Sequence, residues 1–247
     1  MAILWYKQDG DTRYEVRSAG NTRRLYTNGV FHSQYNPKKP VTGSVWDLLM
    51  LPAFFRPRQV RRVLVLGVGG GAVIRQFNHF LQPVQIVGVE LNPVHLEIAE
   101  EIFEVGAPNV TLHLADALWW VKQYRGEPFD FIIDDLFSDN EGDPQRAVVA
   151  DSGWFRQLLK ILAPEGALVT NFGSPGELRA CAWFADERIR NQFPSAFQLT
   201  TPLYENAIGA FLRSQADSAV LRKELAAIPE LDAARKSCRL NYRIRRL

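Results

Sequence analysis

Two patterns of apolar and polar residues divide the chain. Up to about residue 41, short segments rich in aromatic and β-branched residues are separated by turn sequences such as "QDGD" and "TNGV". This pattern is typical of short antiparallel strands joined by tight turns. From residue 42 onward, continuous apolar runs alternate with segments of helical periodicity. We therefore expect a small N-terminal antiparallel β domain over residues 1–41 and an α/β domain over residues 42–247.

The α/β region has the pattern of a mostly parallel sheet. Runs such as "RVLVLG", "VQIVGVE" and "FDFIIDD" are continuously apolar, as in strands that are buried on both faces. Helical segments separate these runs, which indicates βαβ units. Further along, "AFQLTTPLY" and "NAIGAFLRS" predict two closely joined strands at an antiparallel edge. The same reasoning predicts single helices over residues 42–55 and 177–193.

Composition narrows the class of protein only a little. Hydrophobic residues make up 47% and charged residues 23%, which is typical of a globular protein. The net charge is only +2, so the basic segment "ARKSCRLNYRIRRL" is interpreted as a solvated tail, and nucleic acid is not an expected partner. The two cysteines, Cys181 and Cys238, are too few for a disulfide framework and suit a reducing compartment. No signal peptide or membrane-spanning run is evident, so we expect a cytoplasmic protein with no membrane partner.

A cluster of glycines follows the first buried strand. Gly67, Gly69, Gly70 and Gly71 lie between "RVLVL" and a predicted helix. Glycines allow a ligand to approach the bare main chain, and the N-terminus of a helix offers free N–H groups to an anionic group. The spacing also fits the dinucleotide fingerprint. The loop therefore predicts a nucleotide-like cofactor without identifying it.

Two acidic residues add to this prediction. Glu90 ends the second buried strand, where a carboxylate accepts hydrogen bonds from ribose hydroxyls in nucleotide sites. Asp116 ends the third strand, where its carboxylate is expected to bind an adenine amino group while the Ala117 N–H donates to a ring nitrogen. Asp116 is also well placed to cap the following helix, and the two roles are compatible. Together these residues predict recognition of an adenosyl group.

The fourth strand ends in two adjacent carboxylates, Asp134 and Asp135. Adjacent residues on a strand point in opposite directions, so we expect one of them to face the cofactor. A carboxylate beside a sulfonium can orient an incoming amine and take its proton. We therefore take the two residues as candidates for the catalytic rim and place Asp134 in the substrate pocket. The alternative is that both belong to the turn chemistry of "LFSDNEGDP".

Taken in order, several motifs resemble those of the spermidine synthase family, a branch of the class I adenosylmethionine-dependent transferases. They are "RLYTNGVFHSQ", "VLVLGVGGGAVIRQF", "VGVELNP", "LADA", "FDFIIDD", "LLKILAPEGALVTN" and "TTPLYENAIGAFLRS". The resemblance implies a Rossmann-like fold with a seven-stranded sheet, a small N-terminal β domain and a homodimer. It also implies cofactor contacts for the glycine loop, Glu90 and Asp116, a catalytic role for Asp135, and a place in the amine pocket for Tyr204.

Departures from the family motifs lead us to favour methyl transfer. The family loop GGGDGG carries an acid that contacts the amino end of decarboxylated adenosylmethionine, and Gly70 stands at that position. The family sequence Asp-Ser-Ser-Asp-Pro also loses polar residues here, where Leu136 and Phe137 follow Asp135. Carrying a dication into a pocket requires several carboxylates. We therefore expect a methyltransferase that uses intact S-adenosylmethionine, no metal and a small-molecule or amine acceptor.

Three alternatives remain open. The first is a polyamine aminopropyltransferase that uses decarboxylated S-adenosylmethionine, with Asp134, Asp139 or Asp143 replacing the missing acids. The second is a cofactor-binding homologue that has lost catalysis. The third is an NAD-dependent dehydrogenase, which Asp116 and the closing pair of strands disfavour.

Overall fold

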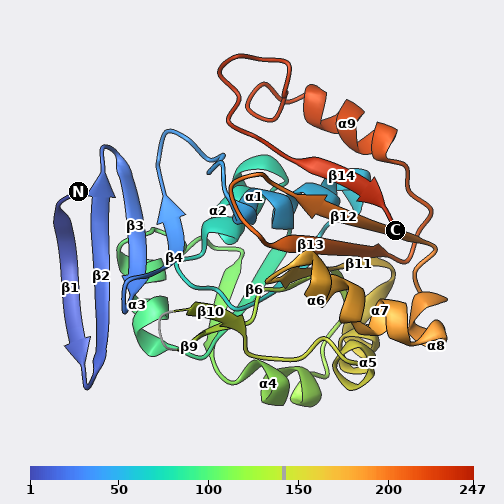
Figure 1. The fold of residues 1–247 in the computed structure, drawn as a ribbon, viewed down its shortest axis with the longest axis horizontal. Helices are drawn as coiled ribbons and strands as arrows, with labels where there is room; N and C mark the ends of the chain where they lie inside the picture. The colour runs from blue at the N-terminus through green and yellow to red at the C-terminus, as the bar shows by residue number, and fades with distance from the viewer. Residues whose placement is uncertain (141–142) are drawn as a thin grey trace.

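The computed structural model describes residues 1–140 and 143–247. The first forty residues form an antiparallel sheet in which each strand pairs with the next along the chain. This sheet stands apart from the main body of the molecule in Figure 1. Its strands are β1 (Ile3–Asp9), β2 (Thr12–Ala19), β3 (Thr22–Thr27) and β4 (Val30–Tyr35). The antiparallel N-terminal sheet predicted from the alternation of short strands and turns is confirmed. The division into two domains at residue 41 stays a prediction.

The rest of the chain is built around a mixed sheet of eight strands. From one edge to the other these are β14 (Arg243–Arg246), β12 (Ser195–Thr200), β13 (Ala207–Leu212), β11 (Leu162–Phe172), β8 (Phe129–Asp134), β5 (Arg62–Leu66), β6 (Gln85–Glu90) and β7 (Val110–Leu114). The strands from β11 to β7 are parallel to one another, whereas β12, β13 and β14 pair in antiparallel fashion. The prediction of a mostly parallel sheet closed by an antiparallel pair is confirmed.

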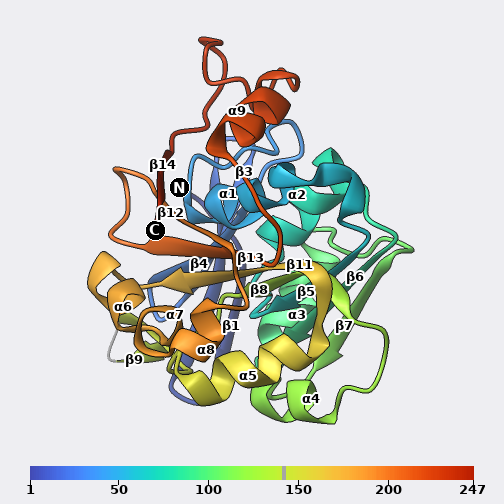
Figure 2. The ribbon, with the colours of Figure 1, turned by 90° about the vertical axis from the view of Figure 1, so that its right-hand side faces the viewer.

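Helices cover both faces of this sheet, as Figure 2 shows. One face carries α1 (Val45–Met50), short 3₁₀ turns over Leu51–Phe55 and Pro57–Gln59, α2 (Ala72–Phe80), α3 (Pro93–Glu101) and α9 (Ser218–Ala226). The other face carries α4 (Ala117–Gln123), α5 (Ser152–Ile161), α6 (Pro175–Ala180), α7 (Ala182–Ala185) and α8 (Glu187–Arg190). A separate two-stranded ladder, β9 (Phe137–Asn140) with β10 (Asp143–Arg146), follows β8.

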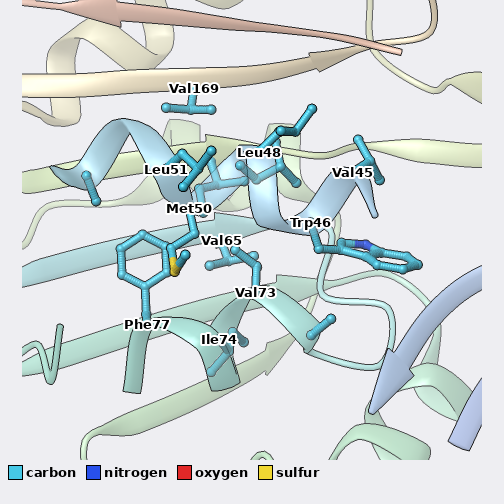
Figure 3. Close-up of a cluster of buried hydrophobic side chains, with 14 of the residues drawn as sticks. Val45, Trp46, Leu48, Met50, Leu51, Val65, Val73, Ile74, Phe77 and Val169 are labelled. Carbon is cyan, nitrogen blue, oxygen red and sulfur yellow. The ribbon is translucent and has the colours of Figure 1, made fainter. Parts of the chain in front are cut away.

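The core on the first face holds α1 against α2 and the central strands. Figure 3 shows the side chains that gather there, which are Val45, Trp46, Leu48, Met50, Leu51, Val65, Val73, Ile74, Phe77 and Val169. All of them are at least nine-tenths buried. Burial of this kind removes apolar area from water and is the main source of stability for the domain. The apolar periodicity along residues 45–51 and 73–77 thus packs α1 and α2 against each other and into the core on this face of the sheet.

Several predicted elements differ from those observed. The segment over 177–193 is three short helices, because Cys181 and Asp186 have extended backbone conformations that interrupt it. The helix predicted from residue 42 begins at Val45 and tightens into a 3₁₀ turn around Pro52, whose ring cannot continue the α-helical hydrogen bonds. Among the described residues, no helix is both long enough and apolar enough to span a membrane.

Part of the basic segment, Arg243–Arg246, belongs to the sheet and is not a solvated tail. Arg243–Arg246 pair with β12 in an antiparallel ladder, which adds an eighth strand to the seven that we expected. The Arg245 guanidinium donates to Gln198 on the neighbouring strand, and Arg246 lies over the ring of Phe197. Positive charge on an edge strand also discourages pairing with other chains.

Candidate functional site

A cavity of about 820 Å³ lies between the two sheets, at the carboxyl ends of β5, β6, β7 and β8. From β5 the chain continues to β6 and β7 on one side of β5, and it then returns to β8 on the other side. The strand order therefore reverses between β5 and β8. Ligands of open α/β sheets bind at such a switch point. The N-terminal sheet forms the opposite wall with Thr12, Tyr14, Thr27, Asn28, Val30, Phe31 and His32. The cavity therefore depends on both sheets.

Gly67 sits where β5 and β8 end side by side. Its φ of +84° favours glycine, and a Cβ at this position would lie 2.2 Å from the main-chain oxygen of Asp135. Gly67 N–H donates to Val89 O, and Asp135 N–H donates to Leu66 O. The loop is thus bound to both neighbouring strands, and Gly67, Val68 and Gly69 form part of the cavity wall.

Gly70 and Gly71 are placed differently, since neither is among the residues that line the cavity. A Cβ added to Gly70 would lie 2.6 Å from the ring of Phe103 and 2.8 Å from Cβ of Ser33. A Cβ added to Gly71 would meet Val105 at 2.5 Å. The side-chain direction at Gly70 therefore points into packed protein. The absence of an acid there follows from packing and carries no information about the cofactor.

Glu90 accepts hydrogen bonds from the loops that follow β5 and β6. Its Oε2 accepts hydrogen bonds from the N–H groups of Val68 and Gly69, and its Oε1 accepts one from Asn92 N–H, all at 2.9 Å. The side chain is nearly buried and lines the cavity. The predicted residue is thus in place, and it also fixes the conformation of the glycine loop.

His95, which the sequence reasoning missed, lies next to Glu90 in the cavity wall. It lies in the first turn of α3, where the side chain of Asn92 caps the helix. Its Nε2 lies 2.8 Å from Oγ1 of Thr27, so α3 is bound to the N-terminal sheet. Burial lowers the pKa of His95 to about 4, and the ring is therefore uncharged at neutral pH. The contact of 3.9 Å between its Nδ1 and Glu90 Oε1 is then not an ion pair.

Asp116 caps α4, since its Oδ1 accepts a hydrogen bond of 2.8 Å from Trp119 N–H. The residue is exposed, and together with Ala117 it forms another part of the cavity wall. Capping uses one carboxylate oxygen and leaves the other free for a ligand. The two roles expected for Asp116 are therefore compatible in the structure.

Asp135 follows β8 and faces the cavity. Its Oδ1 accepts a hydrogen bond of 2.7 Å from Nδ2 of Asn171, at the end of β11. Asn171 in turn accepts a hydrogen bond of 3.0 Å from Nδ2 of Asn206, which lies just before β13. Desolvation, the largest effect, raises the pKa of Asp135 to about 6, although the Asn171 hydrogen bond opposes it. A carboxyl group with this pKa is mostly ionised at neutral pH and is a stronger base than an ordinary aspartate.

Asp134 points in the opposite direction and does not line the cavity. Its Oδ2 accepts hydrogen bonds from Nη2 of Arg146 at 2.9 Å and from Nε1 of Trp154 at 3.1 Å. The side chain is completely buried. Our placement of Asp134 in the substrate pocket is therefore corrected, because the alternation of the strand directs it toward α5 while Asp135 faces the ligand space.

The cavity also has an aromatic and apolar part. Trp46 packs against Phe31 with its ring nearly perpendicular and the centroids 5.1 Å apart. Leu136, Phe137 and the half-exposed Tyr204 complete this part of the wall. Tyr204 lies on the connection between β12 and β13, so the closing pair of strands brings it to the site.

The charge of the cavity wall is one-sided. It contains four carboxylates, from Asp9, Glu90, Asp116 and Asp135, and no lysine or arginine among the described residues. Such a wall attracts a cation and repels an anion. The side chains of Asp139 and Asp143 lie outside the part of the chain that the structure describes. Within that part, no group of three or more His, Cys, Asp or Glu side chains could hold a metal ion.

The doubly wound sheet with its antiparallel edge is the fold of the class I adenosylmethionine-dependent transferases. A probable spermidine synthase from Corynebacterium glutamicum shares this fold, with a TM-score of 0.72 over 93% of this chain and 89% of that one, at 21% identity. Within this class, the chain belongs to the family of the spermine/spermidine synthase domain, whose model matches residues 47–224. The resemblance stated from the motifs is thus confirmed at the level of the family.

Curated relatives of this chain are polyamine aminopropyltransferases. The protein of that name from Mycobacterium tuberculosis is 29% identical over 213 residues, which is 82% of this chain and 38% of the relative. Polyamine aminopropyltransferase 2 from Caldanaerobacter subterraneus subsp. tengcongensis is 29% identical over 126 residues, which is 50% of this chain and 42% of the relative. The matched part therefore spans less than half the length of these two relatives.

The prediction of methyl transfer is wrong in the light of these comparisons. The family and its curated relatives favour aminopropyl transfer, which is the first of the alternatives left open by the sequence. The argument failed at Gly70, whose Cβ direction points at Phe103 and not into the cavity. It also overlooked the absence of lysine and arginine from the described cavity wall, where the carboxylate of intact adenosylmethionine would need a partner.

Proposed function

We propose that this chain transfers an aminopropyl group from decarboxylated S-adenosylmethionine to an amine. The observation that carries the proposal is the cavity wall with four carboxylates and no lysine or arginine among the described residues. The decarboxylated donor carries a sulfonium and a primary ammonium group and no carboxylate, so it matches this wall. The names of the curated relatives support the same reaction.

Glu90, Asp116 and Ala117 are proposed to bind the adenosyl part of the donor. A carboxylate has about four acceptor positions, and three of those on Glu90 are used by main-chain N–H groups. Oε2 accepts two of these hydrogen bonds and Oε1 only one. A ribose hydroxyl would therefore donate to Oε1 of Glu90. The free oxygen of Asp116 is proposed to accept from the adenine amino group. Of the predicted glycines, Gly67 and Gly69 are the two whose main chain adjoins the ligand space.

The proposed reaction is an in-line displacement at carbon. The acceptor nitrogen attacks the aminopropyl methylene carbon that is bonded to the sulfonium. The bond between this carbon and sulfur breaks, and its electron pair stays on sulfur to give a neutral thioether. The acceptor nitrogen loses a proton, which Asp135 takes as general base. The Asn171 amide orients the Asp135 carboxylate, and holding both reactants in line supplies much of the rate. Tyr204 is proposed to line the acceptor end of the cavity.

The most direct test is incubation of the protein with decarboxylated S-adenosylmethionine and putrescine, followed by mass spectrometry of the products. We expect spermidine and a thioether nucleoside, and loss of both in the Asp135→Asn variant. Asp217→Asn is the matched control, because Asp217 caps α9 away from the cavity and asparagine caps equally well. No aminopropylated product with any amine in a panel, or transfer from intact S-adenosylmethionine alone, would overturn the proposal.

The homodimer implied by the family resemblance and the cytoplasmic location expected from the sequence stay predictions. Sedimentation of the purified protein at two concentrations tests the first of them.

A further inference from the structure

Arg146 is a buried arginine next to the site but outside the cavity wall. It ends β10, and only 2% of its side chain is exposed. Its Nη2 donates to Asp134 Oδ2 at 2.9 Å and to Val148 O at 3.0 Å, and its Nε donates to Val148 O at 3.2 Å. Its Nη1 donates to Asn171 O at 2.5 Å. One side chain thus binds the ends of β8, β10 and β11 together.

Stability alone is a weak explanation for this arrangement. Removing two charges from water is costly, and apolar residues of similar volume often serve a core as well or better. Oδ1 of Asp134 is buried and has no hydrogen-bond partner among the described residues, so its desolvation is only partly offset. The guanidinium and carboxylate are therefore better explained by what they hold in place.

A short series of contacts leads from Arg146 to the reacting group. The guanidinium fixes the main-chain oxygen of Asn171, and the Asn171 amide donates to Asp135 Oδ1 at 2.7 Å. Asn206 donates to the Asn171 side chain at 3.0 Å, which sets the orientation of its amide. Asn171 is thus held at its main chain by Arg146 and at its side chain by Asn206.

We propose that Arg146 is a positioning residue for aminopropyl transfer, which acts by fixing Asn171 and through it the orientation and charge of the Asp135 carboxylate. This inference rests on the proposed function for its kinetic part only. Arg146 does not line the cavity and is not expected to touch either substrate.

The charges around Asp135 predict in which direction its pKa changes when Arg146 is replaced. Besides desolvation, the largest effect, the negative charges of Asp134 and Glu90 raise the pKa of Asp135, whereas the Asn171 hydrogen bond and Arg146 lower it. Loss of Arg146 removes a positive charge and loosens the amide. Both changes are expected to raise the pKa of Asp135.

Arg146→Lys and Arg146→Met test the proposal, with Arg213→Met as the matched control. A lysine keeps the charge, but its compact ammonium cannot reach all the partners of the planar guanidinium. Arg213 is a partly buried arginine that binds main-chain oxygens of Leu159, Leu162 and Ala163 away from the cavity. For both Arg146 variants we expect kcat to fall about 100-fold, as for a misplaced catalytic group. The donor KM should change by less than about threefold, because ground-state binding is untouched.

The second measurement does not need turnover. The pKa of Asp135 is followed by carboxyl NMR in protein with labelled aspartate, and its signal is assigned by its loss in Asp135→Asn. We expect an upward shift in Arg146→Met, and also in Asn171→Ser, which removes the amide without disturbing the buried ion pair. The Arg213→Met control should leave the titration unchanged.

A folded Arg146→Met variant with unchanged kcat and an unchanged titration of Asp135 would overturn the inference. If Arg146→Met does not fold, Arg146→Lys and Asn171→Ser decide, and an unchanged pKa in both counts against it. Absence of aminopropyl transfer in the unmodified protein would overturn the proposed function. The NMR titrations of Asp135 would still test the link between Arg146 and Asp135.

Discussion

The two halves of the cavity are built by different means. The first half, formed by residues 67–69, Glu90, Asp116 and Ala117, is held by hydrogen bonds between carboxylates and main-chain N–H groups. The second half is formed by Asp135, Asn171 and Tyr204. Here the side chains of Asp135 and Asn171 are joined by a hydrogen bond, and Arg146 binds the main chain of Asn171 from behind. The first half depends on loop geometry close in sequence, and the second on residues brought together from several strands.

Under the proposed function, this difference separates the residues that bind the donor from those that take part in the chemical step. In the first half, the acids accept hydrogen bonds from main-chain N–H groups and keep acceptor positions for a ligand. In the second half, the pKa of Asp135 is raised by desolvation and adjusted by neighbouring side chains. Changes in the first half should therefore alter donor KM, and changes in the second half should alter kcat and its dependence on pH.

The largest effect is expected from Asp135→Asn. Loss of the general base should lower kcat by about 10²–10⁴-fold with little change in donor KM. In the unmodified enzyme, kcat should fall as the pH drops below about 6, because Asp135 becomes protonated. Steady-state kinetics between pH 5 and pH 9 measure both effects. A variant that keeps more than about one tenth of the activity would remove Asp135 from the role of base.

The same variant should be more stable than the unmodified protein at neutral pH. The folded-state pKa of Asp135 is raised, so the folded protein binds the proton more tightly than the unfolded chain, and the ionised form lowers stability above about pH 6. Asp135→Asn removes this cost, and we expect a gain of about 1 to 2 kcal/mol at pH 8. The gain should disappear as the pH falls toward 4, which chemical denaturation at several pH values can follow.

Glu90→Gln is expected to have a smaller effect, and this effect is on the donor KM rather than on kcat. A glutamine offers one acceptor oxygen in place of two, so at least one of the N–H groups of Val68, Gly69 and Asn92 loses its partner. We expect donor KM to rise about 10- to 100-fold and stability to fall by about 1–3 kcal/mol. Calorimetric titration with the donor and thermal unfolding measure these changes. Glu97→Gln, at an exposed ion pair with Lys7, is the control. An unchanged donor KM would argue against a role in binding.

The smallest effect is expected at Asp116, where capping and ligand binding can be separated. Asp116→Asn keeps the cap and should change the free energy of unfolding by only a few tenths of a kcal/mol, whereas Asp116→Ala should lower it by about 1 kcal/mol. Both variants alter the charge near the proposed adenine site and should raise donor KM about two- to fivefold. If the donor KM rises only in Asp116→Ala, the variant that also loses stability, Asp116 acts only as a helix cap.

The first half of the cavity could be predicted largely from the sequence. Strand, glycine loop and acid follow one another at short intervals, and this order alone is enough to place Gly67, Glu90 and Asp116 at adjacent strand ends. The spacing could not show that the Cβ direction of Gly70 is filled by Phe103, since that contact joins segments more than thirty residues apart. This position contributed to the error about the reaction.

The second half of the cavity could be predicted from the sequence only in part. The alternation of a strand predicts that Asp134 and Asp135 diverge, but it cannot say which partner Asp134 finds. Arg146 and Asn171 carry no local signal, because an arginine after a turn and an asparagine at the end of an apolar run are common. The interpretation of the whole basic segment as a solvated tail was wrong for residues 243–246 for a similar reason, since their pairing with β12 depends on tertiary contacts rather than on their own composition.

The wall shared by the two sheets also bears on how the protein folds. The N-terminal sheet pairs only strands adjacent in sequence and can form early, whereas the cavity unites residues from Asp9 to Asn206. Contacts over such distances along the chain form late and slowly. A donor that binds only the completed cavity would stabilise the last stage of folding and slow its reversal. Supply of the substrate in the cell would then help to set the lifetime of the protein.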